Sequence, residues 1–472
     1  MDKRWESAAA AVADVPDGAT IMVGGFSFPG APRTLIQALA DHGARDLTLI
    51  ANGASGPPGA PEIGLLVERG LVRKAIVSFP VARQPDSPFE RQYLAGQIEL
   101  ELVPQGTLAE RIRAGGAGIP AFYTPSGADT VLGEGKPRAV FDGRECVLET
   151  ALRADFALVH AEAADAHGNL VFHATARNFN PVMAMAARVT IAEANRLVAA
   201  GDLDPEAIVT PGLFVDRIVP AVIPMPPRRA EPPAERTEGG PALRDGKPVL
   251  SRAGIAARIA GELRDGDVVN LGTGLPTLVA NYVPPGVRLV LHAENGVLGF
   301  GPYARPGEED PELASAGANL VTLLPGAAFF HSADSFAMVR GGHIDVAVLG
   351  GYQVSAEGDL ANWIVPGQKV PAVGGAMDLV RGARRVIVGM EHTTRDGGYR
   401  LLNACTYPLT GRACVSTVVT DLAVIDVTSD GLLLREIAPG WTVDEVQALT
   451  EPPLRVAPDL RAIAGGYGAD GR

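Results

Sequence analysis

The tetrapeptide Ala293-Glu294-Asn295-Gly296 places an acidic side chain directly after an apolar run, where the chain is expected to turn. The run, residues 287–292, is typical of a buried strand, and parallel α/β sheets bind ligands beyond the carboxyl ends of their strands. A carboxyl group with an ordinary pKa of about 4.3 is ionised at pH 7, and a carboxylate can attack a thioester without a separate general base. The same residues also suit an Asn-Gly hairpin turn with an incidental acid, so the tetrapeptide alone leaves both interpretations open.

Two glycine-rich loops each follow a predicted strand and precede a predicted helix. They read GGFSFPGAP over residues 24–32 and GTGLP over residues 272–276. Glycines let backbone N–H groups approach a ligand closely, and a helix N-terminus favours an anion. Neither loop is a dinucleotide-binding fingerprint, and a purely structural tight turn is the alternative for each. A third pair, Gly374-Gly375, exposes N–H donors that could stabilise an oxyanion, or else simply begins a helix.

Composition limits the class of protein. The chain has 472 residues, 47% hydrophobic and 20% charged, which predicts two well-packed domains rather than a disordered chain. A net charge of -13 argues against a nucleic-acid-binding face. No apolar run approaches the roughly 20 residues that span a bilayer, and the N-terminus resembles neither a signal peptide nor a mitochondrial presequence. We therefore expect a cytoplasmic protein that binds neither nucleic acid nor membrane.

Cysteine and histidine usage predicts neither disulfides nor a metal site. The three cysteines are odd in number and form no Cys-x-x-Cys pair, which is typical of a reducing compartment. The eight histidines show no metal-binding spacing.

A polar segment divides the chain into two similar halves. Residues 225–246 are dense in Pro, Gly and charge, which predicts an extended linker between a first domain, 1–224, and a second, 247–472. The stretch 17–26 recurs as 265–274, with the same Asp-Gly turn, strand and glycine loop. A second echo pairs the segments FALV and GNL of the first half with VAVL and GDL of the second, in the same order. A duplicated domain explains both echoes.

Short β-branched runs alternate with amphipathic stretches in both halves, a pattern that predicts parallel sheets covered by helices. The predicted fold class is therefore α/β, with two related, open, largely parallel domains that arose by duplication. Residues 96–103 and 417–427 are β-rich and could add antiparallel strands.

Longer motifs connect the chain to a known family. Residues 17–32, DGATIMVGGFSFPGAP, and 291–299, LHAENGVLG, resemble the two signatures of the family I CoA-transferases. The likeness covers nearly the whole chain, including ARNFNPVM (176–183), FHSADSFAMVRGGHIDVAVLGG (330–351) and GGAMDLV (374–380). The chain is thus similar to members in which A and B subunits are fused, the arrangement that the duplication and linker indicate independently.

The resemblance implies a ping-pong transfer in which Glu294 becomes a glutamyl-CoA thioester. It implies oxyanion donors at the Asn52 amide and at the N–H of Gly374 or Gly375. It implies succinyl-CoA as donor and acetoacetate as acceptor, with 3-oxoadipate the alternative acceptor, no cofactor beyond the CoA esters, and a homodimer. The residues it implies for contact with CoA or substrate are Gly24, Gly25, Gly30, Gln105, Gly272, Gly274 and Asn295.

Two departures from the family pattern affect the predicted site. Ala293 stands where Ser is usual, which removes a possible supporting hydrogen bond. Residues 51–55 read ANGAS where two adjacent asparagines are common, so Asn52 is the one remaining amide. Two rival functions stay open: a sugar-phosphate sensor of the same fold, which needs no nucleophilic Glu, and an acyl-CoA hydrolase, in which water would consume the thioester.

Overall fold

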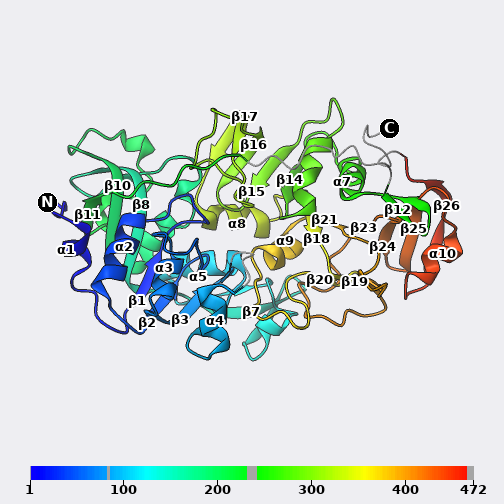
Figure 1. Ribbon diagram of the computed structural model, residues 1–472, viewed down its shortest axis with the longest axis horizontal. Helices are drawn as coiled ribbons and strands as arrows, with labels where there is room; N and C mark the ends of the chain where they lie inside the picture. Colours follow the sequence, from blue (N-terminus) through cyan, green and yellow to red (C-terminus); the bar gives the residue numbers. More distant parts are fainter. Residues whose placement is uncertain (1, 82–85, 231–241, 465–472) are drawn as a thin grey trace.

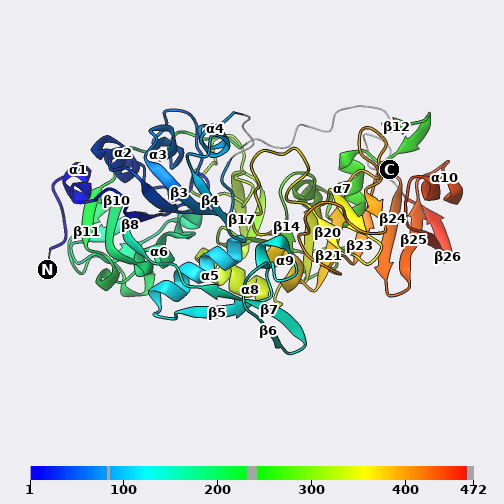
Figure 2. The same cartoon turned by 90° about the horizontal axis from the view of Figure 1, so that it is seen from below.

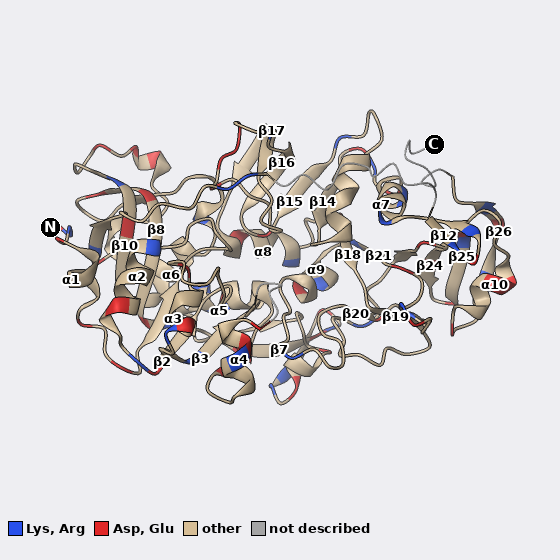
Figure 3. Ribbon diagram, in the orientation of Figure 1, with Lys and Arg blue, Asp and Glu red and all other residues tan. Residues whose placement is uncertain are grey.

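The computed structural model describes residues 2–81, 86–230 and 242–464. Figures 1 and 2 show an elongated molecule, with the first half at one end and the second half at the other. Within the described ranges, no helix combines the length and apolar character needed to cross a membrane. Acidic and basic residues are interspersed along both halves in Figure 3, and many form pairs, such as Lys74 with Glu99 at 2.8 Å.

The first half is built on a parallel sheet with the strand order β11-β10-β8-β1-β2-β3-β4. Short apolar runs form its central strands, whose side chains are buried on both faces, as expected when helices cover a parallel sheet. Its strands are β1 (Thr20–Val23), β2 (Leu47–Ile50), β3 (Val72–Val77), β4 (Glu99–Leu102), β8 (Ala154–Asp165), β10 (Ala187–Val198) and β11 (Arg217–Pro220), with β9 (Leu170–Val171) antiparallel to β8.

Among the described residues of this half, six α-helices accompany the sheet, and a small antiparallel sheet lies beside it. The helices are α1 (Ala8–Val12), α2 (Arg33–His42), α3 (Gly64–Glu68), α4 (Pro88–Leu94), α5 (Gln105–Gly116) and α6 (Asn180–Ala186). The small sheet has the order β5-β7-β6, from β5 (Ala121–Thr124), β6 (Arg138–Phe141) and β7 (Arg144–Thr150). Residues 96–103, which the sequence allowed as an antiparallel addition, instead supply β4, which pairs in parallel with β3.

The second half repeats the parallel centre and extends it at both edges. The order is β17-β16-β15-β14-β18-β21-β23-β24-β25-β26, in which β15, β14, β18, β21 and β23 are parallel neighbours. The central strands are β14 (Val268–Leu271), β15 (Val290–Ala293), β18 (Val346–Gly350), β21 (Arg385–Gly389) and β23 (Thr417–Val419). The edges are β16 (Val297–Tyr303) and β17 (Val321–Phe329) on one side, and β24 (Ala423–Thr428), β25 (Gly431–Ile437) and β26 (Leu454–Ala462) on the other. Pairing of β23 with β24 is antiparallel, as the β-rich run 417–427 allowed.

The remaining elements of the second half cover this sheet or connect its strands. They are α7 (Arg252–Ala260), α8 (Ser332–Arg340), α9 (Ala376–Gly382), α10 (Val443–Ala448), the 3₁₀ run η5 (Leu275–Tyr282), and the short strands β12 (Ala242–Arg244), β13 (Lys247–Val249), β19 (Gln353–Ser355), β20 (Leu360–Ala361) and β22 (Leu401–Leu402). The predicted linker 225–246 therefore ends in a strand, since β12 pairs with β13; its residues 231–241 lie outside the described ranges.

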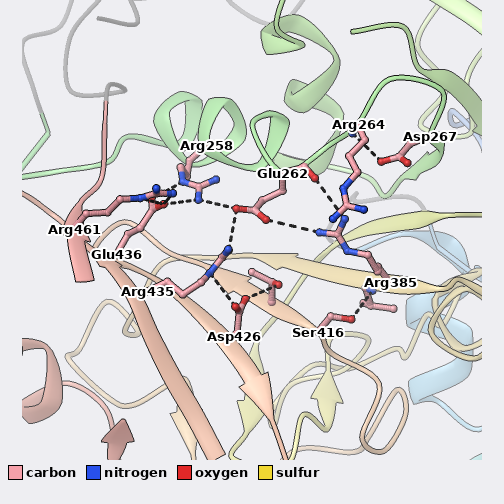
Figure 4. A network of polar contacts seen from close by, with 12 residues as sticks. Arg258, Glu262, Arg264, Asp267, Arg385, Ser416, Asp426, Arg435, Glu436 and Arg461 are labelled. Atoms are coloured by element: carbon pink, nitrogen blue, oxygen red, sulfur yellow. Dashed lines mark hydrogen bonds and ion pairs between the residues drawn. The ribbon is translucent and has the colours of Figure 1, made fainter. Parts of the chain in front are cut away.

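Charged pairs hold α7 against β25, near one edge of the second sheet (Figure 4). Arg258 of α7 contacts Glu436 of β25 at 2.6 Å and Glu262 at 2.7 Å, and Arg435 contacts Glu262 at 2.9 Å. Burial raises the pKa of Glu262, but these arginines outweigh burial and leave the pKa below its ordinary value. The network fixes the outer edge of the second half, far from the junction with the first.

The two halves share part of their core. One buried apolar cluster lies within the first half and another within the second, apart from single residues that each receives from the other half. A third joins them, and it includes Leu108 and Ile112 of α5 together with Phe336 of α8 and Leu379 of α9. Figure 2 shows α5, α8 and α9 side by side at the junction. The halves are thus packed together by apolar side chains as well as connected by the chain.

Candidate active site

Glu294 lies in the three-residue turn between β15 and β16, which pair antiparallel. The predicted hairpin turn is confirmed, and the turn also stands at the carboxyl end of a strand that is parallel to β14. A catalytic role for the acid stays a prediction. The Glu294 side chain is half-buried, and its Oε2 accepts a hydrogen bond from Asn270 Nδ2 at 3.2 Å. Burial raises the pKa of Glu294, opposed by hydrogen bonds that include that of Asn270. The ordinary pKa assumed from sequence does not apply here.

A buried polar layer supports this carboxylate. Asn270 Nδ2 also donates to His292 Nδ1 at 3.1 Å, and His292 Nε2 lies 2.9 Å from the hydroxyl of Ser335 on α8. Burial lowers the pKa of His292 to about 4, so the ring is neutral at pH 7. Because Nδ1 accepts from an amide, Nε2 carries the proton and donates it to Ser335, whose hydroxyl is 3.4 Å from the carbonyl of Ala293. The layer orients Glu294 without adding a charge.

A second polar group is assembled from both halves at their junction. Asn52 follows β2, Gln105 begins α5, and Gly374 and Gly375 precede α9. Gln105 Nε2 donates to Asn52 Oδ1 at 2.5 Å, and Gln105 N–H donates to the carbonyl of Gly374 at 2.9 Å. The structure thus brings these four residues together, although the first and the last of them are more than 300 positions apart in the sequence.

The backbone distinguishes between the two glycines. Gly374 N–H donates to the carbonyl of Ser78 at 3.1 Å, whereas the described residues offer no hydrogen-bond acceptor to Gly375 N–H. In the same way Asn52 Oδ1 is held by Gln105, and no acceptor is found for Asn52 Nδ2 within the described ranges. Gly375 N–H and Asn52 Nδ2 are therefore the two donors here without a hydrogen-bond acceptor among the described residues.

Helix α8 contacts both the polar layer that supports Glu294 and the second polar group. We call this second group, which consists of Asn52, Gln105, Gly374 and Gly375, the donor group. Ser335 contacts His292, while the next residue, Phe336, is fully buried against the first turn of α9. A Cβ at Gly375 would lie 3.1 Å from the Phe336 ring and 3.2 Å from Gln105 Oε1. Both groups are thus adjacent to one helix at the junction of the halves (Figure 1).

The first glycine loop is occupied by the protein itself. Gly30 N–H donates to Glu312 Oε2 at 2.9 Å, and Leu35 N–H, at the start of α2, donates to Glu193 Oε2 at 2.9 Å. A Cβ at Gly24 would lie 1.9 Å from Asn180 Oδ1, so this glycine is required by packing. The anion-favouring end of α2 is filled by the protein's own carboxylates. Contact of Gly24, Gly25 and Gly30 with CoA stays a prediction.

The second glycine loop and Asn295 are also held by local contacts. Gly272 N–H donates to the carbonyl of Val348 at 2.9 Å, and the carbonyl of Gly274 accepts from Thr277 Oγ1 at 2.7 Å. Asn295 Nδ2 donates to the carbonyl of Ala314 at 2.7 Å, which anchors the Glu294 turn. A role for these residues in binding CoA stays a prediction.

A cavity of about 330 Å³ lies beside β15. Leu291, His292 and Ala293 of that strand line it, together with residues of η5 and β16. Glu294 is not among the described residues that line it, but His292 of the polar layer is.

Sequence reasoning missed Asn270, His292 and Ser335. Asn270 interrupts the apolar run of β14, and His292 ends that of β15. Polar residues inside buried strands need hydrogen-bond partners, so these two carried a signal that the sequence could have revealed. Ser335 carried none, because its partner is 43 residues away.

The model of the coenzyme A transferase family matches residues 5–221 and 252–449. The chain is 44% identical to mitochondrial succinyl-CoA:3-ketoacid coenzyme A transferase 2 of Homo sapiens, over 96% of this chain and 90% of that protein. It is 56% identical over 206 residues to one of the subunits of 3-oxoadipate CoA-transferase of Pseudomonas putida, a match that covers 43% of this chain and 96% of that protein.

The fold is shared with a solved acyl-CoA transferase of Escherichia coli O157:H7. The TM-score is 0.77 at 22% identity, over 98% of this chain and 95% of that one. The two largely parallel α/β domains predicted from sequence are thereby confirmed as the fold of these enzymes.

The predicted cytoplasmic location is wrong, as the comparison with relatives of similar sequence shows. Relatives that match 96% of the chain, from Homo sapiens, Mus musculus and Rattus norvegicus, are all named as mitochondrial.

Proposed function

The chain belongs to the coenzyme A transferase family and is a CoA-transferase, and on this premise we propose that it moves CoA from succinyl-CoA to a 3-oxoacid, with acetoacetate as the first-choice acceptor. The observation that carries the proposal is the half-buried Glu294 carboxylate, which accepts a hydrogen bond from Asn270 Nδ2 at a strand end. The relatives that match nearly the whole chain are named for succinyl-CoA and a 3-ketoacid.

In the first half-reaction, Glu294 is the nucleophile. A carboxylate oxygen attacks the thioester carbonyl, the C–S bond breaks, and a mixed anhydride and CoA thiolate form. The thiolate then attacks the glutamyl carbonyl, and succinate leaves as glutamyl-CoA thioester forms. The acceptor carboxylate repeats both steps in reverse order, so no proton is gained or lost overall.

Each attack on a carbonyl produces an oxyanion. Asn52 Nδ2 and Gly375 N–H are the donors proposed to stabilise it, because each is preorganised by the hydrogen bonds of its neighbours. No further cofactor is needed, since Glu294 and the CoA thiolate supply both nucleophiles.

Burial of Glu294 serves the same chemistry. The desolvation that raises its pKa also leaves the ionised form less stabilised by water, and so more nucleophilic. A site that excludes water also protects the thioester from hydrolysis, which favours transfer over the hydrolase alternative.

3-Oxoadipate is the alternative acceptor. The 56% identity to one subunit of a 3-oxoadipate CoA-transferase supports it, because that relative is matched over nearly its whole length. We also propose a homodimer as the working assembly.

A panel of acceptor acids tests the proposal. Purified enzyme with succinyl-CoA is given acetoacetate, 3-oxoadipate, acetate or water, and the new CoA ester and succinate are quantified by chromatography. We expect acetoacetate to give the highest kcat/KM, with parallel double-reciprocal lines when both substrates are varied. A higher kcat/KM for 3-oxoadipate selects the alternative, and succinate release in water alone at the same rate contradicts transfer.

A further inference from the structure

A buried carboxylate from the second half reaches into the first half. Asp378, in the first turn of α9, is 0% exposed. Its Oδ2 accepts a hydrogen bond from Gly106 N–H at 2.8 Å, and its Oδ1 accepts one from the hydroxyl of Ser126 at 2.8 Å. Gly106 is the second residue of α5, whose N-cap Pro104 provides no side-chain cap. Asp378 therefore caps a helix of the other half, at the end where negative charge is favoured.

The contact is close, and hydrogen bonds offset part of the cost of burying the carboxyl group. A Cβ at Gly106 would lie 2.4 Å from Asp378 Oδ1, so the approach requires glycine. Burial raises the pKa of Asp378, and the charge of Arg340 and the hydrogen bonds from Ser126 and Gly106 oppose this rise without cancelling it. Arg340 of α8 also donates to the carbonyl of Gly106 at 3.1 Å.

The capped residue is adjacent to the donor group. Gln105 contacts both Asn52 and Gly374, and Asp378 N–H donates to the carbonyl of Gly375 at 3.2 Å. The two proposed oxyanion donors come from different halves, so their separation depends on how α5 meets the start of α9.

We propose that Asp378 is a positioning residue that sets this separation. By capping α5 it fixes Gln105, and through Gln105 the Asn52 amide, relative to the Gly375 N–H. The inference rests on the proposed function, because it assumes that these two groups stabilise the oxyanion. Asp378 itself contacts no substrate in this scheme, and its loss should lower kcat more than it changes KM, since oxyanion contacts are made in the transition state.

Asp129 provides a matched control. Like Asp378 it bridges the halves, accepting hydrogen bonds from the guanidinium of Arg381 and from Arg412 N–H. Neither partner belongs to the donor group. Asp129→Asn therefore weakens the same junction without releasing Gln105 or Gly374.

The test compares kcat, KM for succinyl-CoA and Tm for the wild type, Asp378→Asn, Asp129→Asn and Ser126→Ala, each as the full chain. We expect Asp378→Asn to lower kcat about 30- to 100-fold with KM within about threefold, as for the loss of one oxyanion contact. Asp129→Asn should lower Tm about as much as Asp378→Asn does, but it should keep kcat within about threefold of the wild type. Ser126→Ala removes one of the two hydrogen-bond donors to Asp378 and retains the Asp378 carboxylate. It should lower kcat about three- to tenfold.

Equal kcat losses in Asp378→Asn and Asp129→Asn, or a change confined to KM, would overturn the positioning role. If Asp378→Asn does not fold, an unchanged kcat in Ser126→Ala overturns it instead. A wild-type enzyme without transfer activity would contradict the proposed function, whereas an active wild type with an unaffected Asp378→Asn contradicts only this inference.

Discussion

The two halves place different residues at the same point of two corresponding sheets. The order β10-β8-β1-β2 in the first half corresponds to β21-β18-β14-β15 in the second, all parallel. Met22 pairs with Ile50 in the first half, and Asn270 pairs with His292 in the second. Because Met22 and Asn270 each follow the repeated Asp-Gly turn by the same number of residues, these pairs are equivalent.

Asn52 lies two residues after Ile50, and Glu294 lies two residues after His292. The proposed oxyanion amide and the proposed nucleophile are therefore duplicated positions. An alanine, Ala51 or Ala293, precedes each of them.

The layer beneath these two residues also differs between the halves. Met22 and Ile50 are buried in the apolar core, whereas Asn270 and His292 form the hydrogen-bonded layer with Ser335. The neutral Asn52 amide has Gln105 as its hydrogen-bond partner, whereas a carboxylate in a partly buried site carries a charge and needs donors close by. The comparison indicates that the polar layer is what allows the second half to carry an acid.

The neighbouring strand differs as well. After β2 the first half crosses over to parallel β3, while after β15 the second half turns back into antiparallel β16. A hairpin turn fixes Glu294 between two paired strands.

The largest effect is expected for Glu294→Ala, which should abolish transfer. Removing the covalent nucleophile leaves no route for exchange, and we expect a loss of at least about 1,000-fold in kcat. Initial rates of acetoacetyl-CoA formation measure it. A variant that retains more than about a tenth of wild-type transfer would exclude Glu294 as the nucleophile.

The stability of the same variant carries a pH signature. Because burial raises the folded-state pKa of Glu294, the group favours folding at low pH and opposes it as pH rises through that pKa. We expect the Tm of Glu294→Ala to exceed that of the wild type by about one or two degrees at pH 8, with a smaller or reversed difference near pH 4. Calorimetry at both pH values checks the sign.

Asn52→Ala should reduce kcat about 100-fold, as for the loss of one oxyanion donor. KM for succinyl-CoA should change little, since the donor acts in the transition state. Circular dichroism and Tm provide the folding control. An unchanged kcat would show that Asn52 is not an oxyanion donor, although its position would still be equivalent to that of Glu294.

Asn270→Met gives the second half the residue that the first half has at the equivalent position, Met22. Loss of the donor to Glu294 should raise the carboxyl pKa further, so the acid limb of the pH–kcat/KM profile should move to higher pH and activity at pH 7 should fall about tenfold. The converse change, Met22→Asn, puts an amide into the apolar core, and we expect it to lower Tm while leaving the acid limb in place. An acid limb that does not move in Asn270→Met would show that the polar layer does not tune Glu294.

The smallest effect is expected from dividing the chain within the predicted linker. Co-expressed 1–230 and 242–472 should co-purify with transfer within about threefold of the intact chain, because a shared apolar cluster and several hydrogen bonds join the halves. Each half alone should be poorly soluble, since that cluster would be exposed. Two soluble halves that do not associate would contradict this account of the junction.

The sequence predicted the features that depend on local pattern. Apolar runs located β1, β14 and β15, and the Asp-Gly echoes indicated the duplication. The acid after an apolar run placed Glu294 at a strand end. Its pKa could not be predicted, because burial depends on packing from elements that are distant in the chain.

Other features required long-range pairing. The equivalence of Asn52 and Glu294 was hidden because the second half has fewer residues between its first two strands than the first half, which shifts the alignment. The filling of the first glycine loop by Glu193 and Glu312, and the capping of α5 by Asp378, join residues more than 150 positions apart. No local pattern indicates such contacts.

Intact mass spectrometry of the denatured enzyme tests the central claim most directly. Incubated with succinyl-CoA and no acceptor, the wild type should gain the mass of CoA less one water, located on the peptide that contains Glu294. Hydroxylamine should remove the adduct, and so should acetoacetate added before denaturation, because the second half-reaction consumes it. Glu294→Gln should show no adduct under the same conditions. An unmodified wild-type mass, in a preparation that transfers CoA at full rate, would contradict the covalent role of Glu294.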